Sequence, residues 1–158
     1  MPRGLTMDRS DHVHGYEVRE LPPGEEALAA AALLELRGRF GDAAAVAERA
    51  REQRAEGYRL VAAFEPGEDE AAAVAGFRVQ RNLAWGRHLY VDDLSTRAGH
   101  RGRGHGAALM EWLAETARRA GCAELHLDSG VQAERESAHR LYFNQRLRIA
   151  SYHFSREL

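Results

Sequence analysis

Arg101-Gly102-Arg103-Gly104-His105-Gly106 lies between a predicted strand, Leu89 to Thr96, and a segment of helical spacing that begins at Ala107. Three glycines in six residues let the backbone come close to a ligand, and the first backbone N–H groups of a helix have no partner within it. The helix dipole adds partial positive charge at the same point. The order of strand, glycine-rich turn and helix therefore predicts an anion site, and it favours phosphate as the anion.

One interpretation of this hexapeptide competes with a phosphate site, and two other phosphate-binding motifs can be tested against the same residues. The competing interpretation is a flexible surface turn with solvated arginines, although glycine at a helix start costs roughly 1 kcal/mol relative to alanine, which a bound pyrophosphate would offset. A Walker loop needs lysine, and the chain contains none. Gly102, Gly104 and Ala107 match the dinucleotide fingerprint, but that motif follows the first strand of its fold, whereas about a hundred residues precede it here.

Arg101, Gly104 and Gly106 also satisfy the pattern Arg-x-x-Gly-x-Gly, and here the sequence resembles the GCN5-related N-acetyltransferase (GNAT) family. The resemblance runs from about Tyr58 to Tyr142. It implies that this loop wraps the pyrophosphate of acetyl-CoA, the co-substrate, while the end of the preceding strand hydrogen-bonds the pantetheine arm. The residues that the resemblance assigns to acetyl-CoA are Leu94, Ser95, Thr96, Arg101, Gly102, Arg103, Gly104, His105, Gly106 and Ala107.

Length and composition describe one ordinary globular domain. The chain has 158 residues, 44% of them hydrophobic and 29% charged, and its net charge of −2 does not fit a nucleic-acid binder. The single Cys122 allows no internal disulfide, and no apolar run has membrane-spanning length. We expect a disordered leader over residues 1–12, a single N-acetyltransferase domain over 13–158, a cytoplasmic location and no membrane partner. His12 and His14 alone are too few ligands to predict a metal site.

Periodicity and turn residues predict the order β, α, α, β, β, β, α, β, α, β. Pro66-Gly67 and Trp85-Gly86 mark reversals between three antiparallel strands, and the glycine loop with its helix forms a βαβ unit whose strands should be parallel. This order matches the α/β (α+β) GNAT fold, a mixed central sheet with an antiparallel meander, a parallel βαβ unit and helices on both faces. Strands are expected at 14–21, 58–65, 71–83, 87–96, around 125–127 and at 149–156, and helices at 24–37, 42–56, 107–121 and 133–145.

The C-terminal part departs from the family pattern. Family members usually end the last helix with Gly-Phe and add two strands, whereas this chain has Arg146-Leu147 there and only about ten further residues. The acceptor side of the pocket, or a dimer edge, is therefore expected to be built differently. A short last strand over 149–156 would leave an unfinished sheet edge, which predicts a homodimer.

A phase change interrupts the strand before the glycine loop. Leu89 and Val91 share one face, but the next apolar residue, Leu94, has the other parity, so a one-residue bulge at Asp92-Asp93 would restore the register. The alternative is an irregular strand end. In the resembled family such a bulge opens the slot for pantetheine, and an acid often occupies one of these two positions. Adjacent carboxylates raise the pKa of one of the pair, which makes it a better base, although solvated or amine-orienting charge is an equal alternative.

Tyr142 is the candidate proton donor. It ends the run Ala138-His139-Arg140-Leu141-Tyr142, which is similar to the family's A-x-x-L/F-Y, where the phenol protonates the leaving thiolate. A tyrosine on an apolar helix face is more often part of a core, so core packing is the alternative. Cys122 has no evident histidine partner and is expected to be a small buried residue.

These residues together predict an N-acetyltransferase that moves acetyl from acetyl-CoA to a primary amine by direct attack in a ternary complex, with Asp92, Asp93 and Tyr142 as catalytic residues. Whether the amine belongs to a small molecule or to a peptide is not readable. In the resembled family, the segment that corresponds to Arg37 to Gly41 forms one wall of the acceptor site. In this chain, a plain connection between two helices is an equal alternative. The rival function is a coenzyme A-binding sensor without turnover, against which the intact aspartates and tyrosine argue.

Overall fold

The computed structural model describes residues 11–13 and 15–158. Most of the predicted elements are present within two or three residues of their expected bounds. The strands are β1 (Asp11–Val13), β2 (Tyr16–Leu21), β3 (Arg59–Phe64), β4 (Ala73–Asn82), β5 (Gly86–Thr96) and β6 (Glu124–Leu127). The α-helices are α1 (Ala30–Leu36), α2 (Ala43–Gln53), α3 (His105–Arg119) and α4 (Glu136–Asn144), and the 3₁₀ turns are η1 (Glu26–Ala29), η2 (Gly38–Phe40), η3 (Arg54–Glu56), η4 (Ala98–His100) and η5 (Ala133–Arg135).

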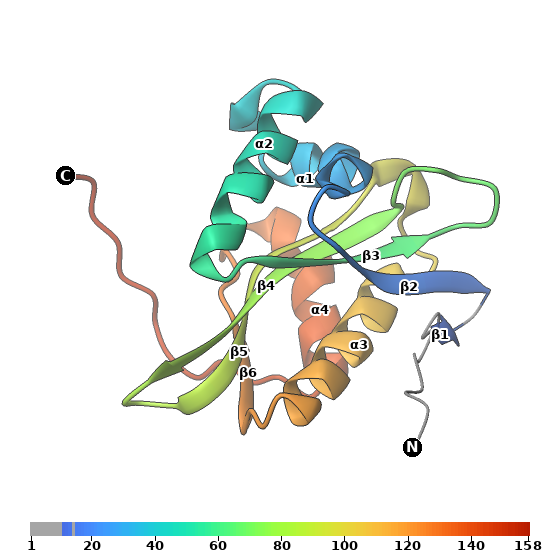
Figure 1. The fold of residues 1–158 in the computed structure, drawn as a ribbon. Coiled ribbons are helices and arrows are strands. Elements are labelled where there is room, and N and C mark those ends of the chain that lie inside the picture. The colour runs from blue at the N-terminus through green and yellow to red at the C-terminus, as the bar shows by residue number, and fades with distance from the viewer. Residues whose placement is uncertain (1–10, 14) are drawn as a thin grey trace, which may run out of the picture.

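The six strands form one sheet in chain order, β1 to β6 (Figure 1). Neighbours from β1 to β5 are antiparallel, while β5 and β6 are parallel and joined through α3. The predicted meander and βαβ unit are therefore confirmed. Figure 1 also shows α1 and α2 on one face of the sheet and α3 and α4 on the other.

Alternation along β3 explains why both faces of the sheet are covered. Leu60, Ala62 and Phe64 pack with α1 and α2, whereas Val61 and Ala63 pack in a second cluster with α3. Because successive strand residues point to opposite faces, a strand that is apolar throughout must lie between two layers. The sheet therefore separates two cores.

A polar residue begins one helix, and glycines follow the ends of two helical segments, where the sequence predicts. The Asp42 carboxylate accepts a hydrogen bond from the Ala45 N–H at 2.8 Å and caps α2. Gly57 and Gly121 follow their helical segments with φ of 87° and 73°, a left-handed conformation that glycine adopts without a Cβ clash. These local signals fix the helix ends on either side of the sheet.

The predicted last strand over 149–156 is wrong. Residues 145–158 form no strand, and the tail runs out from the body of the molecule with Ile149, Tyr152 and Phe154 exposed (Figure 1). Alternating apolar residues form a strand only where a neighbouring edge pairs with their backbone, and no described strand does so here. The homodimer that we inferred from this strand stays a prediction.

At the N-terminus, residues 1–10 of the expected leader lie outside the described residues. The strand Asp11–Val13 crosses the boundary that we expected at residue 12, since it pairs with β2. In the part of the chain that the structure describes, no helix is both long and apolar enough to cross a membrane.

Arg146 takes the place of the glycine that usually ends the last helix of the resembled family. It has φ of 65°, and it is the single non-glycine residue with positive φ among the described residues. The Leu147 N–H bonds the Tyr142 carbonyl at 2.9 Å and the Arg146 N–H bonds that of Phe143 at 3.0 Å. This is a Schellman motif, so α4 ends in the usual geometry despite the different residues.

Candidate active site

The strand β5 carries the predicted bulge. Its register with β4 shifts between Gly76, which faces Asp93, and Phe77, which faces Val91, so Asp92 is the extra residue. Leu94 consequently packs against the same apolar cluster as Leu89 and Val91, as the phase change in the sequence predicts. The bulge places two carboxylates at one point of the sheet.

Beyond the bulge, β5 has a strand partner on one side only. Its parallel pairing with β6 ends at Val91 and Leu127, whereas pairing with β4 continues to Thr96. In the described sheet, the segment Leu94–Thr96 therefore faces away from β4 without a ladder partner on that side. Unpaired strand backbone of this kind can hydrogen-bond an extended ligand.

A cavity of about 230 Å³ opens where β5 and β6 separate. We call it the Tyr142 cavity. Val91, Asp92 and Leu94 of β5 line it, together with Leu127 of β6 and Tyr142 of α4. Tyr142 is buried, and its hydroxyl accepts one long hydrogen bond, 3.4 Å, from Arg135 Nη2. Tyr142 thus lines the same cavity as a bulge carboxylate.

A second cavity, of about 310 Å³, lies on the other side of the bulge. We call it the Arg39 cavity. The connection between α1 and α2 contributes Arg37, Arg39 and Phe40, while Asp92 and Asp93 line it from β5. Arg37 and Asp92 line both cavities, so the two adjoin at the bulge. Residues of the segment 37–41 therefore line a cavity beside the bulge, and their place in an acceptor site stays a prediction.

The two bulge aspartates have different partners. Asp93 accepts hydrogen bonds from Arg37 Nε at 2.8 Å and from the Tyr58 hydroxyl at 2.7 Å, so both its oxygens are engaged. Asp92 accepts one from Arg78 Nε at 2.7 Å. Burial raises the pKa of Asp92, an effect that Arg78 opposes and the neighbouring Asp93 charge reinforces. The sequence analysis expected one of the two carboxyls to have a raised pKa, and Asp92 has it. Its main cause is burial and not the adjacent carboxylate.

Tyr58, Arg37 and Arg78 hold these carboxylates, and the sequence analysis did not identify them as site residues. Burial and the Asp93 charge raise the pKa of Tyr58 well above its ordinary value, so its hydroxyl stays a donor. Gly76 makes room for this contact, because a Cβ there would lie 1.9 Å from the Tyr58 hydroxyl oxygen. A glycine in the middle of an apolar strand was the available signal, since it often marks a bulge or a close approach.

The glycine loop has the backbone geometry of an anion site. Gly102 and Gly104 have φ of 77° and 85°, and Gly104 is the residue before the first turn of α3. A Cβ on Gly106 would meet Leu141 of α4 at 2.9 Å, so this glycine lets α3 and α4 pack closely. The N–H groups of the first helical turn, from His105 to Ala107, remain for a ligand.

Two side chains of the glycine loop, those of Arg103 and His105, contact a carboxylate of the protein, whereas that of Arg101 is mostly exposed. Arg103 donates to Glu65 at 2.6 Å, and the buried His105 lies 2.8 Å from the same carboxylate through Nε2. Arg101 is mostly exposed, and its contacts with described residues are a 3.3 Å bond to the Thr96 carbonyl and Glu35 at 4.0 Å. Of the two predicted phosphate-binding arginines, Arg101 is the one whose guanidinium is loosely held.

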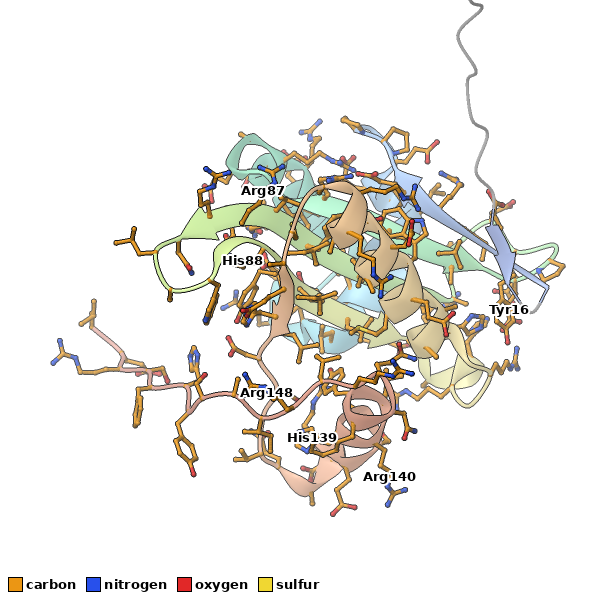
Figure 2. All side chains as sticks on the ribbon, turned by 90° about the horizontal axis from the view of Figure 1, so that it is seen from below. Tyr16, Arg87, His88, His139, Arg140 and Arg148 are labelled. Atoms are coloured by element: carbon orange, nitrogen blue, oxygen red, sulfur yellow. The ribbon has the colours of Figure 1, made fainter. Side chains whose placement is uncertain are left out.

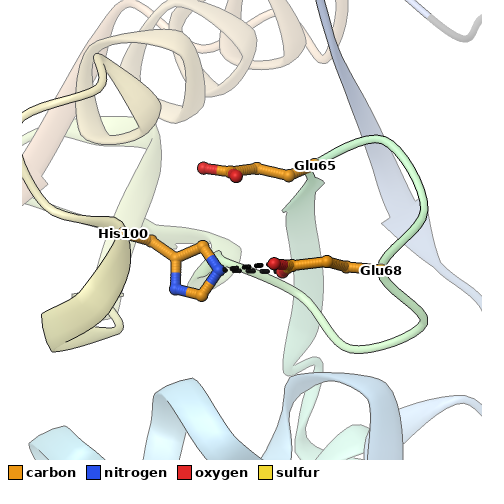
Figure 3. Close-up of side chains that lie close together, drawn as sticks. All are labelled: Glu65, Glu68 and His100. Carbon is orange, nitrogen blue, oxygen red and sulfur yellow. Dashed lines mark hydrogen bonds and ion pairs between the residues drawn. The ribbon is translucent and has the colours of Figure 1, made fainter.

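Acidic residues from the turn between β3 and β4 anchor this loop (Figure 3). His100 Nε2 lies 2.8 Å from Glu68, beside Glu65. Glu65, Glu68 and His100 bring ligand atoms within 4.8 Å of one another, a spacing that a metal ion could use. Each of the three already has a hydrogen-bond partner in the protein, and Arg103 brings a cation to Glu65, so we assign them to anchoring.

Tyr16 of β2 also holds the loop (Figure 2). Its hydroxyl donates to the Arg103 carbonyl, and its ring lies 4.2 Å from the His105 ring between centroids. The glycine loop is thus fixed by β2 and by the end of β3. Its backbone is held in place before any ligand arrives.

Comparison with known proteins agrees with this geometry. The family model described as "Acetyltransferase (GNAT) family" matches residues 26–146. An uncharacterised N-acetyltransferase of Bacillus subtilis (strain 168), YhdJ, is 35% identical over 100 residues, which cover 63% of this chain and 68% of that protein. Streptothricin acetyltransferase of Streptomyces lavendulae is 37% identical over 68 residues, which cover 42% of this chain and 36% of that enzyme.

A solved structure shows the same fold at low identity. AAC(6′)-Iy, in complex with the bisubstrate analogue CoA-S-monomethyl-acetylneamine, superposes with a TM-score of 0.74 at 13% identity, over 90% of this chain and 98% of that one. The family match covers most of the chain and includes the bulge, the glycine loop and Tyr142. The chain belongs to the GNAT acetyltransferase family and is an acetyltransferase.

Proposed function

We propose that this enzyme transfers acetyl from acetyl-CoA to a primary amine by direct attack in a ternary complex. The observation that carries the proposal is the pair of cavities that adjoin at Asp92. One adjoins the free side of β5 and the tyrosine of α4, and the other adjoins the connection between α1 and α2. Two substrates that enter from opposite sides would meet at the bulge, as a ternary mechanism requires.

The residues present fit acetyl-CoA. The backbone of Leu94–Thr96 would bond the pantetheine arm, and the N–H groups from Gly102 to Ala107, with Arg101, would hold the pyrophosphate. When bound, acetyl-CoA supplies the acetyl thioester whose carbonyl carbon forms the new bond to nitrogen as the carbon–sulfur bond breaks. The protein's part is to position the two reactants and to move two protons.

Asp92 is the better candidate of the two aspartates for the base. An alkylamine has a pKa of ~10.4, so at neutral pH its nitrogen must lose a proton before it can attack. Asp92 lines both cavities, its raised pKa makes it a stronger base, and among the described residues its carboxylate bonds to Arg78 alone. Both oxygens of Asp93 are occupied, so we assign Asp93 to orienting Arg37 and Tyr58.

Tyr142 is the candidate acid. Its hydroxyl would give a proton to the sulfur that leaves, and its polar contact within the described protein is the long one to Arg135, at 3.4 Å. Donor and base then act at different points of one cavity. This separation lets the amine lose a proton while the thiolate gains one.

Incubating the protein with acetyl-CoA and a panel of primary amines, with thiol release as the readout, tests the proposal. We expect thiol release that depends on the amine and an acetylated product of the matching mass. Coenzyme A binding by calorimetry without thiol release on any amine would instead support a sensor that lacks turnover.

A further inference from the structure

Positively charged side chains outnumber carboxylates around the Arg39 cavity. Three arginines line it, Arg37 and Arg39 from the helix connection and Arg49 from α2, against Asp92 and Asp93 from the bulge. Resting on the function proposed above, we propose that the acceptor carries an acidic group, a carboxylate or a phosphate, in addition to its primary amine, and that Arg39 and Arg49 bind it.

Both carboxylates of this cavity are already balanced by arginine. Arg37 pairs with Asp93 at 2.8 Å, and Arg78, which does not line the cavity, pairs with Asp92 at 2.7 Å. The carboxylates that line the cavity therefore leave Arg39 and Arg49 unneutralised, and Glu52, which pairs with Arg49, does not line the cavity. An acidic group on the ligand would meet the positive charge of these two arginines, and a charge-assisted bond to arginine is about twice as strong as a neutral one.

Neither of these two arginines has a strong competing partner. Arg39 forms no ion pair with a described residue, and its guanidinium lies 4.9 Å from the centroid of the Phe40 ring. Arg49 pairs with Glu52 on its own helix at 2.8 Å, with 61% and 51% of the two side chains exposed. Pairs so exposed contribute little stability, so a ligand can replace this one.

The apolar part of the Arg39 cavity lining fits an acceptor with a short hydrocarbon body. Leu33, Phe40 and Val46 also line the cavity. An acceptor would therefore place its amine at Asp92, its hydrocarbon body along this apolar wall and its acid at Arg39 and Arg49. Polycationic amines such as aminoglycosides would put like charges against the two arginines, and like charges destabilise a complex.

Matched probes with and without an acid test this inference. The pairs are 6-aminohexanoate with hexylamine, and glucosamine 6-phosphate with glucosamine, and neamine serves as the polycation. Specificity constants come from thiol release, and dissociation constants from calorimetry on protein saturated with coenzyme A. We expect at least one acid-bearing member to exceed its partner by about tenfold or more in both measurements. The pair that shows this preference distinguishes carboxylate from phosphate.

Variants test whether Arg39 and Arg49 cause the preference for acid-bearing acceptors. Arg39→Gln with Arg49→Gln should abolish it by raising KM for the acid-bearing probe while kcat stays near the wild-type value. Arg51→Gln is the matched control, because Arg51 lies on the same helix, is also 61% exposed and pairs with Glu48, but does not line the cavity. The control should keep the preference.

The outcomes separate the two proposals. Equal or better use of acid-free amines would overturn the inference while leaving the acetyltransferase function intact, and so would a preference that survives the double variant. Acid-dependent binding without any thiol release would support the inference and reject the proposed reaction. Failure of every acid-bearing probe to bind would overturn the inference.

Discussion

The bulge of β5 and the glycine loop both hold charged side chains together, but the charged side chains have different roles. At the bulge two aspartates are each held by an arginine, with Asp92 and Asp93 lining cavities. At the loop one glutamate, Glu65, holds both Arg103 and His105, and these side chains turn toward the protein. The difference separates two tasks. The bulge carboxylates line cavities, whereas the ion pairs of the loop fix the backbone to which we assign the proposed binding of coenzyme A.

Only one of the two arginines in the loop remains a candidate for direct phosphate contact. Two arginines beside three glycines suggest that both side chains contact phosphate, yet Arg103 forms an ion pair with Glu65 at the end of β3. Its contribution to coenzyme A binding would then be indirect, through the position of the loop. Arg101 remains the candidate for direct contact.

The largest expected effect comes from Tyr142→Phe, which tests whether the bulge acts together with a proton donor. The hydroxyl makes one long bond and the ring is buried, so the variant should fold and bind coenzyme A as the wild type does. If the phenol protonates the thiolate, kcat should fall by about 10²- to 10⁴-fold. Steady-state thiol release and calorimetry measure the two quantities. Tyr152→Phe is the control, because Tyr152 is exposed and does not line the Tyr142 cavity. Full turnover in Tyr142→Phe would remove the tyrosine from the mechanism.

Replacing Asp92 and Asp93 separately by asparagine sharpens the contrast within the bulge. A carboxylate accepts a proton only above its pKa, and the pKa of Asp92 is raised by burial, so the acid limb of kcat/KM should lie above the ordinary carboxyl range. In Asp92→Asn the rate should fall by about 10²-fold near neutral pH. The defect should shrink toward the amine pKa of ~10.4, where the amine is neutral without help.

Asp93→Asn should retain more activity at neutral pH and keep an acid limb, moved to lower pH because the Asp93 charge helps to raise the pKa of Asp92. Its loss would come from misplaced Arg37 and Tyr58, since both hydrogen-bond this carboxylate. The pH profiles of kcat/KM for the two variants are the measurement. The reverse order, with Asp93→Asn the more defective and lacking the acid limb, would transfer the base to Asp93.

Features that the sequence predicted correctly depend on neighbouring residues. The bulge follows from the parity of Leu89, Val91 and Leu94 along one strand, and the α2 cap follows from Asp42 alone. The glycine loop likewise needs only the order of strand, turn and helix. Each of these signals lies within about one turn or one strand, where geometry is set by local sterics.

Features that the sequence missed depend on distant partners. Tyr58 meets Asp93 from 35 positions away and Glu65 meets His105 from 40 positions away, so neither contact leaves a local pattern. The strand predicted at 149–156 failed for the opposite reason, because its alternation is local but its pairing requires another edge. Whether Tyr142, Asp92 and Asp93 act in catalysis stays a prediction that the variants above test.

Gly104→Val tests whether the loop binds through its backbone. A β-branched residue at φ of 85° is strained, by about 1–3 kcal/mol. Coenzyme A affinity should therefore fall by about tenfold or more. Calorimetry measures the affinity, and Gly121→Val is the matched control, because Gly121 has φ of 73° at the other end of α3 with no atom near a new Cβ. Unchanged affinity in folded Gly104→Val protein would rule out the loop as the pyrophosphate site.

The smallest expected effect is that of Glu65→Gln, which removes the charge that anchors the loop and keeps the shape of the side chain. Hydrogen bonds from His105 and Arg103 lower the pKa of Glu65, so its folded-state pKa lies below its unfolded value. The stability that it contributes is therefore present above the ordinary glutamate pKa and is lost as the pH falls through the lowered pKa. Thermal melts of the wild type should show a drop in Tm over this acidic range, and the glutamine variant should show a smaller drop.

Coenzyme A affinity of the Glu65 variant should fall only a few-fold, because Tyr16 still holds the Arg103 carbonyl. Glu115→Gln is the control, since Glu115 pairs with Arg119 on the exposed side of α3, away from the loop. If Glu65→Gln weakens binding as strongly as Gly104→Val does, the ion pairs contribute directly to ligand binding and the division of tasks between loop and bulge is wrong. If it changes neither the melt nor the affinity, the loop is held by its backbone and Tyr16 alone.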